Sequence, residues 1–418
     1  MKFIKHISGI VPHTNKNIDI PINFKNLIIT GNNSSGKTQF LLALKDKLDI
    51  YIKEKLIQEK NQIINRINNY KKDLESYQKG SSDYSNRERW LENDLNKLNK
   101  IDSGITIEIP EILDITYKFE KKLATISTFD AMRTSNISHA NQTTSISNEI
   151  SNAQNNFTNN LGNKLEQHLY NITVNQSLSL THKKDSSLFE RYNNWFKSFD
   201  ENLKFLFENE STHLFFEMND TENKYYIVKD SQKFSFQNLS SGYQAIFNIY
   251  SDLLMRTEFF NIAPSELEGI VIIDEIDAHL HISLQKLIFP FFTRSFPKLQ
   301  FIVSTHSPFV ITSTDDDTVV YDISSGDFFE EDLSRYSYES VIKGLFHVNP
   351  ISSDTKNSIE ILKNQLTENP SNYEEIRLIV KNLVELEKND LLDKSLKNLY
   401  LQAINLLADN NQLEDLDV

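Results

Sequence analysis

The residues with the clearest chemistry form a loop near the start of the chain: Gly31, Asn32, Asn33, Ser34, Ser35, Gly36, Lys37 and Thr38. Their spacing is that of a phosphate-binding loop, G-x-x-x-x-G-K-T. Backbone N–H groups can turn inward at the glycines, and the positive end of a following helix favours the same anion. A lysine at this place reaches the β- and γ-phosphates, and a threonine offers its hydroxyl to Mg²⁺. The loop therefore predicts that ATP binds here with Mg²⁺.

The residues on either side of this loop supply the context that the motif requires. An apolar run at 27–30 predicts a strand before the loop, and an apolar stretch at 40–44 predicts a helix after it. The chain has only ten glycines, and two of them are in this loop. A chance match inside a glycine-rich segment is therefore disfavoured.

Two carboxylates, Asp274 and Glu275, follow an apolar run at 270–273 far down the chain. The run predicts a strand that is buried on both faces. In an ATPase, Asp274 would hold Mg²⁺ through water, and Glu275 would polarise the attacking water as a general base. A strand that ends in Asp-Glu is weak evidence alone, because any turn after a strand accommodates Asp. Together with the loop at 31–38 it becomes strong.

Two further polar turns contain candidate site residues. His306 comes after an apolar run at 301–303, and we expect it at the carboxyl edge of a parallel sheet, where ligands of open α/β sheets bind. It could donate a hydrogen bond to a γ-phosphate, although a lone histidine is usually structural. Ser240, Ser241 and Gly242 precede an apolar helical stretch, and the serines could simply cap that helix.

These four motifs, in this order, resemble those of the ATP-binding-cassette (ABC) ATPases, in the soluble branch that includes the SMC and RecF heads. The resemblance covers about residues 1–48, part of 102–135, and about 205–325. It implies an α/β fold with a P-loop ATPase head. It also implies that two heads dimerise around two ATP molecules and that hydrolysis releases the dimer.

The resemblance assigns roles to positions that match the family pattern. It makes Asp274 the metal-side carboxylate, Glu275 the catalytic carboxylate and His306 the switch histidine. Residues 239–242 stand at the family's signature, whose serine and last glycine contact the γ-phosphate held by the other subunit. Residues 278–281 stand at the D-loop, which communicates across that dimer interface.

Some positions depart from the family pattern. Ser241 and Tyr243 replace the signature's usual glycine and glutamine, at positions where the family contacts the partner subunit. His281 stands where transporters carry an aspartate. The glutamine of the Q-loop has no clear place, with Gln142 as one candidate in a segment that is rich in Asn, Gln, Ser and Thr.

The sequence pattern divides the chain into six segments. They are the first part of the head at 1–48, a helical hairpin insertion at 49–101, head strands at 102–135, a mobile loop and helical subdomain at 136–204, the second part of the head with the signature, Walker B and switch motifs at 205–335, and a helical C-terminal region at 336–418. The insertion has apolar residues in steps of four and three, which is heptad spacing. It predicts an outgoing helix of about 28 residues, roughly 42 Å long, and a shorter return helix. The hairpin could pack on the head or project as a coiled-coil-like arm that touches a partner.

Composition limits the class of protein. The chain of 418 residues has no cysteine and a net charge of −14. Disulfides and Cys-ligated zinc are excluded, a cytoplasmic location is expected, and no apolar run is long enough to span a membrane. A globally acidic chain is a poor general nucleic-acid binder, so nucleic acid is a partner that the charge does not indicate.

The layout of a head, a short helical arm and a helical C-terminus resembles the ATPase subunits of bacterial antiphage systems, such as PtuA of Septu and AriA of PARIS. That resemblance implies a hydrolysing ATPase, active as a homodimer or higher oligomer, that controls an effector such as a nuclease or toxin. The alternatives are a RecF- or SMC-like ATPase of DNA repair or chromosomes, and a scaffold that binds ATP without hydrolysing it. A Toprim nuclease is disfavoured because the chain after Asp317 reads as helical, and a transporter subunit is disfavoured by the long helical insertion.

Overall fold

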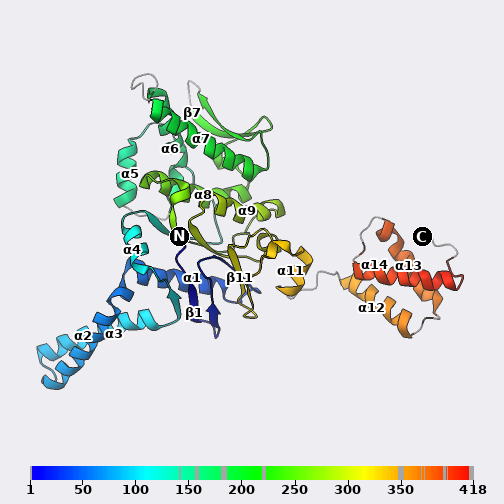
Figure 1. Ribbon diagram of the computed structural model, residues 1–418, viewed down its shortest axis with the longest axis horizontal. Helices are drawn as coiled ribbons and strands as arrows, with labels where there is room; N and C mark the ends of the chain where they lie inside the picture. Colours follow the sequence, from blue (N-terminus) through cyan, green and yellow to red (C-terminus); the bar gives the residue numbers. More distant parts are fainter. Residues whose placement is uncertain are drawn as a thin grey trace. The chain divides into compact units, whose positions relative to one another are not determined.

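The computed structural model shows two compact units, Met1–Val341 and Ile342–Val418 (Figure 1). It describes residues 2–140, 143–155, 160–179, 186–218, 223–346, 353–368, 370, 372–388, 392 and 394–413. Within these ranges, no helix has the length and apolar character needed to cross a membrane.

A six-stranded, mostly parallel sheet forms the centre of the first unit. The strands lie in the order β12 (Phe328–Phe329), β11 (Thr318–Asp322), β3 (Asn26–Thr30), β10 (Leu299–Ser304), β9 (Glu268–Ile273) and β5 (Ala124–Phe129). All neighbours pair in parallel except β11 and β12. Residues on both faces of β3 and β10 are buried, as expected for strands that helices cover on two sides. The expected α/β fold class is confirmed.

The order of the strands brings distant motifs together. β10 lies between β3 and β9, and parallel strands end at the same edge of a sheet. The turns after these three strands carry the phosphate-binding loop, His306 and the Asp-Glu pair, so all three meet at one edge.

A small antiparallel sheet and a helix complete the core beside the central sheet. The small sheet has the order β2 (Asn17–Ile20), β1 (His6–Ile10) and β4 (Ile105–Glu108). Helix α1 (Lys37–Leu48) buries Phe40, Leu41 and Leu44 in the same apolar cluster as the two sheets. Helix α4 (Ile112–Glu120) leads into β5.

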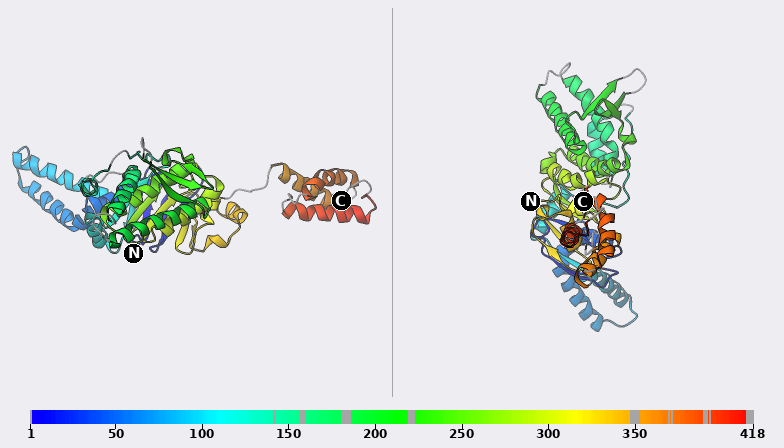
Figure 2. Two further views of the ribbon diagram at one scale, coloured as in Figure 1. Left: turned by 90° about the horizontal axis from the view of Figure 1, so that it is seen from above. Right: turned by 90° about the vertical axis from the view of Figure 1, so that its right-hand side faces the viewer.

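The insertion after α1 forms a hairpin of two helices, α2 (Leu56–Ser76) and α3 (Ser82–Asp102), which projects from the unit (Figures 1 and 2). The expected shorter return helix is wrong, because both helices have 21 residues. The outgoing helix is shorter than expected because a π-helical turn, η1 (Asp49–Lys53), precedes it and Lys55 adopts a left-handed φ of 57°. Arg66 and Asp94 join the two helices through a hydrogen bond of 2.7 Å.

A helical lobe packs beyond the central sheet, with α8 and α9 between them (Figure 1). The two intervening helices are α8 (Ser241–Phe260) and α9 (Ile282–Ser295). The lobe itself consists of α5 (Ile146–Asn155), α6 (Leu165–Leu178), α7 (Ser186–Phe207) and the antiparallel strands β6 (His213–Met218), β7 (Asn223–Lys229) and β8 (Gln232–Phe234). Helix α5 lies in the segment that we expected to be a mobile loop, so that expectation is wrong for residues 146–155. The segment is poor in apolar residues, and its helix is held by packing against α8 rather than by its own sequence pattern.

The remaining elements are short turns and C-terminal helices. The 3₁₀ turns are η2 (Leu161–Lys164), η4 (Phe236–Asn238), η5 (Pro264–Glu266) and η6 (Leu333–Arg335), and the short helices are α10 (Pro308–Ile311) and α11 (Tyr338–Gly344). The second unit contains α12 (Ser353–Glu368), α13 (Tyr373–Lys388) and α14 (Lys394–Asp409) around an apolar core that includes Leu362, Val380 and Ala403. The division between the units falls after Val341, a few residues later than the sequence boundary at 336.

Gln300 joins the start of the chain to the central sheet, and its replacement tests this arrangement. Its fully buried side chain accepts hydrogen bonds from the N–H groups of Phe3 and Ile4 and donates to the carbonyl oxygens of Ile4 and Lys25. Gln300→Leu keeps the volume but leaves buried backbone groups without partners. We expect it to lower the free energy of unfolding by at least about 2 kcal/mol, measured by urea denaturation.

The matched control is Gln62→Leu on the exposed face of α2, which should change the stability by less than about 0.5 kcal/mol. Equal stability of wild type and Gln300→Leu would contradict the buried role of this amide.

Candidate functional site

The phosphate-binding loop runs from the end of β3 to the start of α1 and needs its glycines. Gly31 and Gly36 have left-handed φ angles of 137° and 102°. A Cβ atom on Gly31 would lie 2.6 Å from Ser324 Oγ and 2.9 Å from Ser35 Oγ. Ser324 Oγ also accepts a hydrogen bond of 2.7 Å from the N–H of Asn32. The loop is therefore held in a curve that other residues at Gly31 would disrupt.

Lys37 is the first residue of α1, and its side chain lies inside the loop. Its Nζ donates hydrogen bonds of 3.0 Å to the carbonyl oxygens of Gly31 and Asn32. Burial lowers the pKa of Lys37, while the nearby carboxylates of Glu275 and Asp274 raise it. Neutral carbonyls are weaker partners for an ammonium group than phosphate oxygens are. A phosphate can therefore replace them as the partner of this cation.

Thr38 and Asp274 form the direct link between the two nucleotide motifs. Thr38 Oγ1 donates to Asp274 Oδ2 at 2.8 Å, and Ser304 Oγ donates to Asp274 Oδ1 at 2.5 Å. Ser304 Oγ also accepts from the N–H of Glu275 at 2.7 Å. Residues at the ends of β9 and β10 and at the start of α1 thus share one hydrogen-bond network. Ser304 was not among the predicted site residues; its polar side chain directly after an apolar run was the available signal.

The residues of the loop fit a nucleotide phosphate and a magnesium ion. The first N–H groups of α1 lack partners within the helix, and the buried Ser35 Oγ has no hydrogen-bond partner among the described residues. The described chain holds no cluster of three or more His, Asp or Glu side chains that could bind a metal. Mg²⁺ does not need one, because it usually takes one or two protein ligands together with phosphate oxygens and water. Thr38 and Asp274 would be those ligands.

Glu275 begins the turn that follows β9, and its backbone has an unusual conformation. Its φ is 44°, in the left-handed region, which costs a non-glycine residue energy. The turn is held by Arg133, whose guanidinium donates to the carbonyl oxygens of Asp274 and Glu275 at 2.5 and 2.8 Å. The sequence analysis gave Arg133 no role, because the sequence shows no link between it and residue 275.

His306 lies in the turn after β10, half-buried beside the loop. Burial lowers its pKa, and the positive charge of Lys37 lowers it further. Both effects favour the neutral imidazole, which could donate one hydrogen bond while accepting another. Thr305 Oγ1 donates to Asp277, and Ser307 Oγ donates to Gln285 Oε1 at 2.7 Å, so side chains on both sides of His306 fix its turn.

The signature residues lie at the start of α8. Ser240 and Ser241 are exposed, and the Ser240 side chain makes no capping hydrogen bond to the helix that it precedes. The simple capping role that we considered for Ser240 is therefore wrong. Gly242 is buried, and a Cβ atom there would lie 3.2 Å from both the His279 carbonyl oxygen and Leu284 Cδ1. Gly242 thus allows close packing within its own chain. Gln142 lies outside the described residues.

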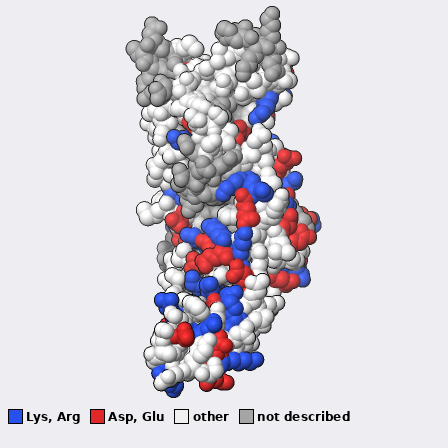
Figure 3. All heavy atoms as spheres, turned by 90° about the vertical axis from the view of Figure 1, so that its left-hand side faces the viewer, with Lys and Arg blue, Asp and Glu red and all other residues white. Residues whose placement is uncertain are grey.

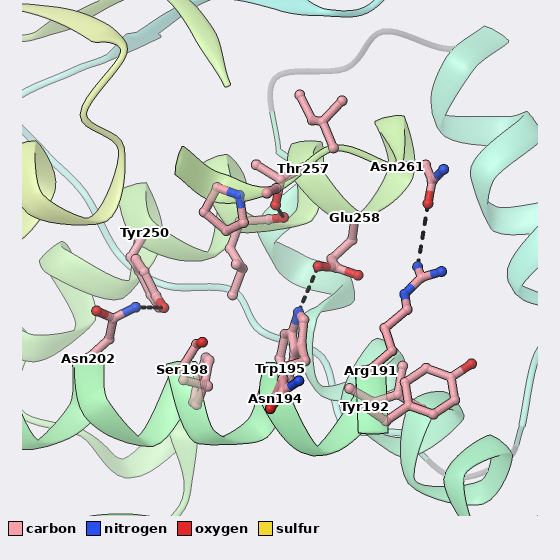
Figure 4. Close-up of a pocket in the computed structure, with 16 residues that line it drawn as sticks. Arg191, Tyr192, Asn194, Trp195, Ser198, Asn202, Tyr250, Thr257, Glu258 and Asn261 are labelled. Atoms are coloured by element: carbon pink, nitrogen blue, oxygen red, sulfur yellow. Dashed lines mark hydrogen bonds between the residues drawn. The ribbon is translucent and has the colours of Figure 1, made fainter. Parts of the chain in front are cut away.

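A cavity of about 420 Å³ lies away from these motifs, between α7 and the end of α8 (Figure 4). Several of its polar groups are paired with each other. Trp195 donates to Glu258 at 2.6 Å, and Asn202 donates to Tyr250 at 3.0 Å. It has no phosphate-binding loop, and none of its lining residues belongs to the predicted site.

Several known proteins are similar to parts of this chain. A retron Vc95 probable ATPase from Vibrio cholerae serotype O1 biovar El Tor is 40% identical over 90 residues, which are 21% of this chain and 18% of that protein. A Septu protein PtuA from Bacillus mycoides (strain KBAB4) is 43% identical over 74 residues, 17% of this chain and 10% of the relative. The matches span less than a fifth of either relative.

A crystal structure of an SMC head bound to the C-winged helix domain of ScpA covers 77% of this chain and 94% of its own chain, with 14% identity and a TM-score of 0.35. A structural similarity with so low a TM-score does not support an inference about function.

A family model also matches the chain, and it confirms the resemblance to P-loop ATPases. It spans residues 27–312, from the strand before the phosphate-binding loop to the turn after His306. Since this is more than half of the chain, the protein belongs to the family described as "AAA domain, putative AbiEii toxin, Type IV TA system".

Proposed function

We propose that the protein binds and hydrolyses ATP with Mg²⁺, and that ATP-driven dimerisation controls an effector protein in bacterial antiphage defence. The observation that carries the ATPase proposal is the hydrogen bond between Thr38 and Asp274. It supports the proposal because the two residues that we propose as magnesium ligands lie side by side, although they are 236 positions apart in the sequence. The names of the retron and Septu relatives support the place in defence.

Each residue of the site has a separate part in this chemistry. Lys37 and the loop N–H groups hold the β- and γ-phosphates, and Thr38 and Asp274 hold Mg²⁺, which neutralises phosphate charge when bound. Glu275 accepts a proton from the attacking water as general base. The neutral imidazole of His306 donates a hydrogen bond to the γ-phosphate.

The exposed serines at the start of α8 support a site that is shared between two subunits. Ser240 and Ser241 make no described hydrogen bond to the phosphate-binding loop of their own chain. In the proposed dimer, their hydroxyl groups would complete the γ-phosphate site of the partner subunit. ATP would then join two heads, and hydrolysis would separate them, so that a bound effector could sense the state of the nucleotide.

The charge of the projecting hairpin does not favour the alternative function in DNA repair. Residues 56–102 contain nine Lys and Arg against eight Asp and Glu. On the face that carries the hairpin, the two signs are interspersed rather than separated into a basic stripe (Figure 3). A surface of this kind suits a protein partner better than a phosphate backbone.

The role of Glu275 is tested by Glu275→Gln, which keeps the size of the side chain but removes its basicity. We expect unchanged ATP binding and turnover at least about a hundredfold slower, within the usual contribution of a general base. Light scattering with ATP and Mg²⁺ should show an accumulated dimer. The control Glu266→Gln, at an exposed site in η5, should hydrolyse ATP normally. Turnover at the wild-type rate in Glu275→Gln would remove this residue from the base role.

The shared site is tested by mixing two inactive variants, Lys37→Ala and Ser240→Arg. Ser240 is the better target in the signature, because a change at Gly242 would disturb packing within its own chain. Each variant alone should be inactive, since both of its composite sites lack a part. In a mixed dimer both defects fall in one site, so the other site is intact and should bind ATP tightly.

ATPase activity and ATP occupancy are measured for the mixture, because coupling between sites could suppress turnover without preventing binding. A mixture that recovers neither turnover nor a tight ATP site would show that each chain completes its own site.

A further inference from the structure

Arg133 reaches from the end of β5 to the turn that holds the catalytic carboxylates. Its side chain is buried, and one nitrogen donates to the carbonyl oxygens of Asp130 at 2.8 Å and Asp274 at 2.5 Å. The other donates to the carbonyl oxygens of Glu275 at 2.8 Å and Ile276 at 3.4 Å. One side chain thus contacts three successive carbonyl groups after β9.

The N–H groups of the same turn donate to residues at the ends of β5 and β10, the two strands that flank β9. Asp274 N–H donates to the carbonyl oxygen of Phe129, and Ile276 N–H donates to that of Ser304, each at 2.9 Å. Glu275 N–H donates to Ser304 Oγ. Strands β5 and β10 therefore fix the donors of the turn, and Arg133 fixes its acceptors. Between them lies Glu275 with its left-handed φ, a strained conformation that persists only where surrounding contacts hold it.

The charge of Arg133 is directed at carbonyl groups instead of carboxylates. Burial lowers its pKa to about 10, with Asp274 and Asp277 opposing that shift, so the guanidinium stays charged at pH 7. Its hydrogen bonds within the described chain go to backbone oxygens, which leaves the carboxylate of Asp274 to Thr38 and Ser304. Arg133 can therefore shape the turn without neutralising a carboxylate by direct pairing.

We propose that Arg133 is a positioning residue, which fixes the backbone of residues 274–276 and thereby aims the Glu275 carboxylate at the attacking water. The inference rests on the proposed ATPase function and adds the residue that orients its general base. Lys37 and the loop hold the phosphates without contact from Arg133, so its loss should affect turnover and leave ATP affinity intact.

Three variants separate positioning from general stability. Arg133→Met removes the charge and all donors at similar length, and Arg133→Lys keeps the charge with fewer directed hydrogen bonds. Arg133→Ala leaves a space that adjoins a polar cavity of about 300 Å³ also lined by Asp130, so that free guanidinium can enter. Gln300→Leu is the control for a purely structural loss, because it should lower stability without slowing turnover per folded molecule.

We expect kcat of Arg133→Met to fall about a hundredfold, as misplacement of a catalytic group by about 1 Å does, with the ATP dissociation constant within about threefold of wild type. Arg133→Lys should recover part of that loss. Millimolar guanidinium should raise kcat of Arg133→Ala about tenfold, while urea at the same concentration should not. Without nucleotide, hydrogen exchange of a peptide that contains residues 274–278 should be faster in Arg133→Met and unchanged in Gln300→Leu.

The possible failures are distinguishable. If wild type hydrolyses ATP and Glu275→Gln does not, but Arg133→Met retains kcat, the positioning role is overturned and the proposed function stands. Equal losses of kcat and ATP affinity in all three variants, with no rescue by guanidinium, would also overturn it, since they indicate a structural role. A wild-type protein with no ATPase activity would overturn both proposals.

Discussion

The short contact between the Thr38 hydroxyl and the Asp274 carboxylate is the constraint on which the site depends. It can form only if the start of α1 lies close to the end of β9. The strand order gives this arrangement, because only β10 lies between β3 and β9 in the sheet. Ser304, at the end of β10, bonds to the same carboxylate and to the Glu275 N–H. The proposed metal ligand Asp274, the proposed general base Glu275 and the phosphate-binding loop therefore depend on the register of three strands.

The residues around the site stabilise backbone conformations that are unfavourable in isolation. The loop turns through left-handed conformations at Gly31 and Gly36, and the turn after β9 does so at Glu275, which is not a glycine. Glycine adopts such angles at little cost, whereas Glu275 requires external support. Ser304, at the end of β10, and Arg133, in the loop after β5, supply this support. The sheet therefore fixes the backbone of Glu275.

The sequence predicted the parts of this account that are local. The phosphate-binding loop has a fixed spacing, and the buried strands at 270–273 and 301–303 are uninterrupted apolar runs. The contacts of Arg133 and Ser304 could not be predicted, because they depend on which strands are neighbours. Helix α5 was not predicted because its sequence is polar and the helix packs against α8. The length of α2 was overestimated because a π-helical turn interrupts the continuous helical sequence pattern. The shared dimer site and the role of each site residue stay predictions.

The central claim, that Thr38 and Asp274 act together on one magnesium ion, is tested most directly by a double-mutant cycle. Thr38→Val and Asp274→Asn, alone and combined, are compared by the Mg²⁺-dependent part of the ATP binding free energy. Two ligands of one ion should show a coupling energy of at least about 1 kcal/mol, because the second loss removes little once the ion is already lost. Effects that add to within about 0.5 kcal/mol would mean that the two residues act independently, and would contradict the account.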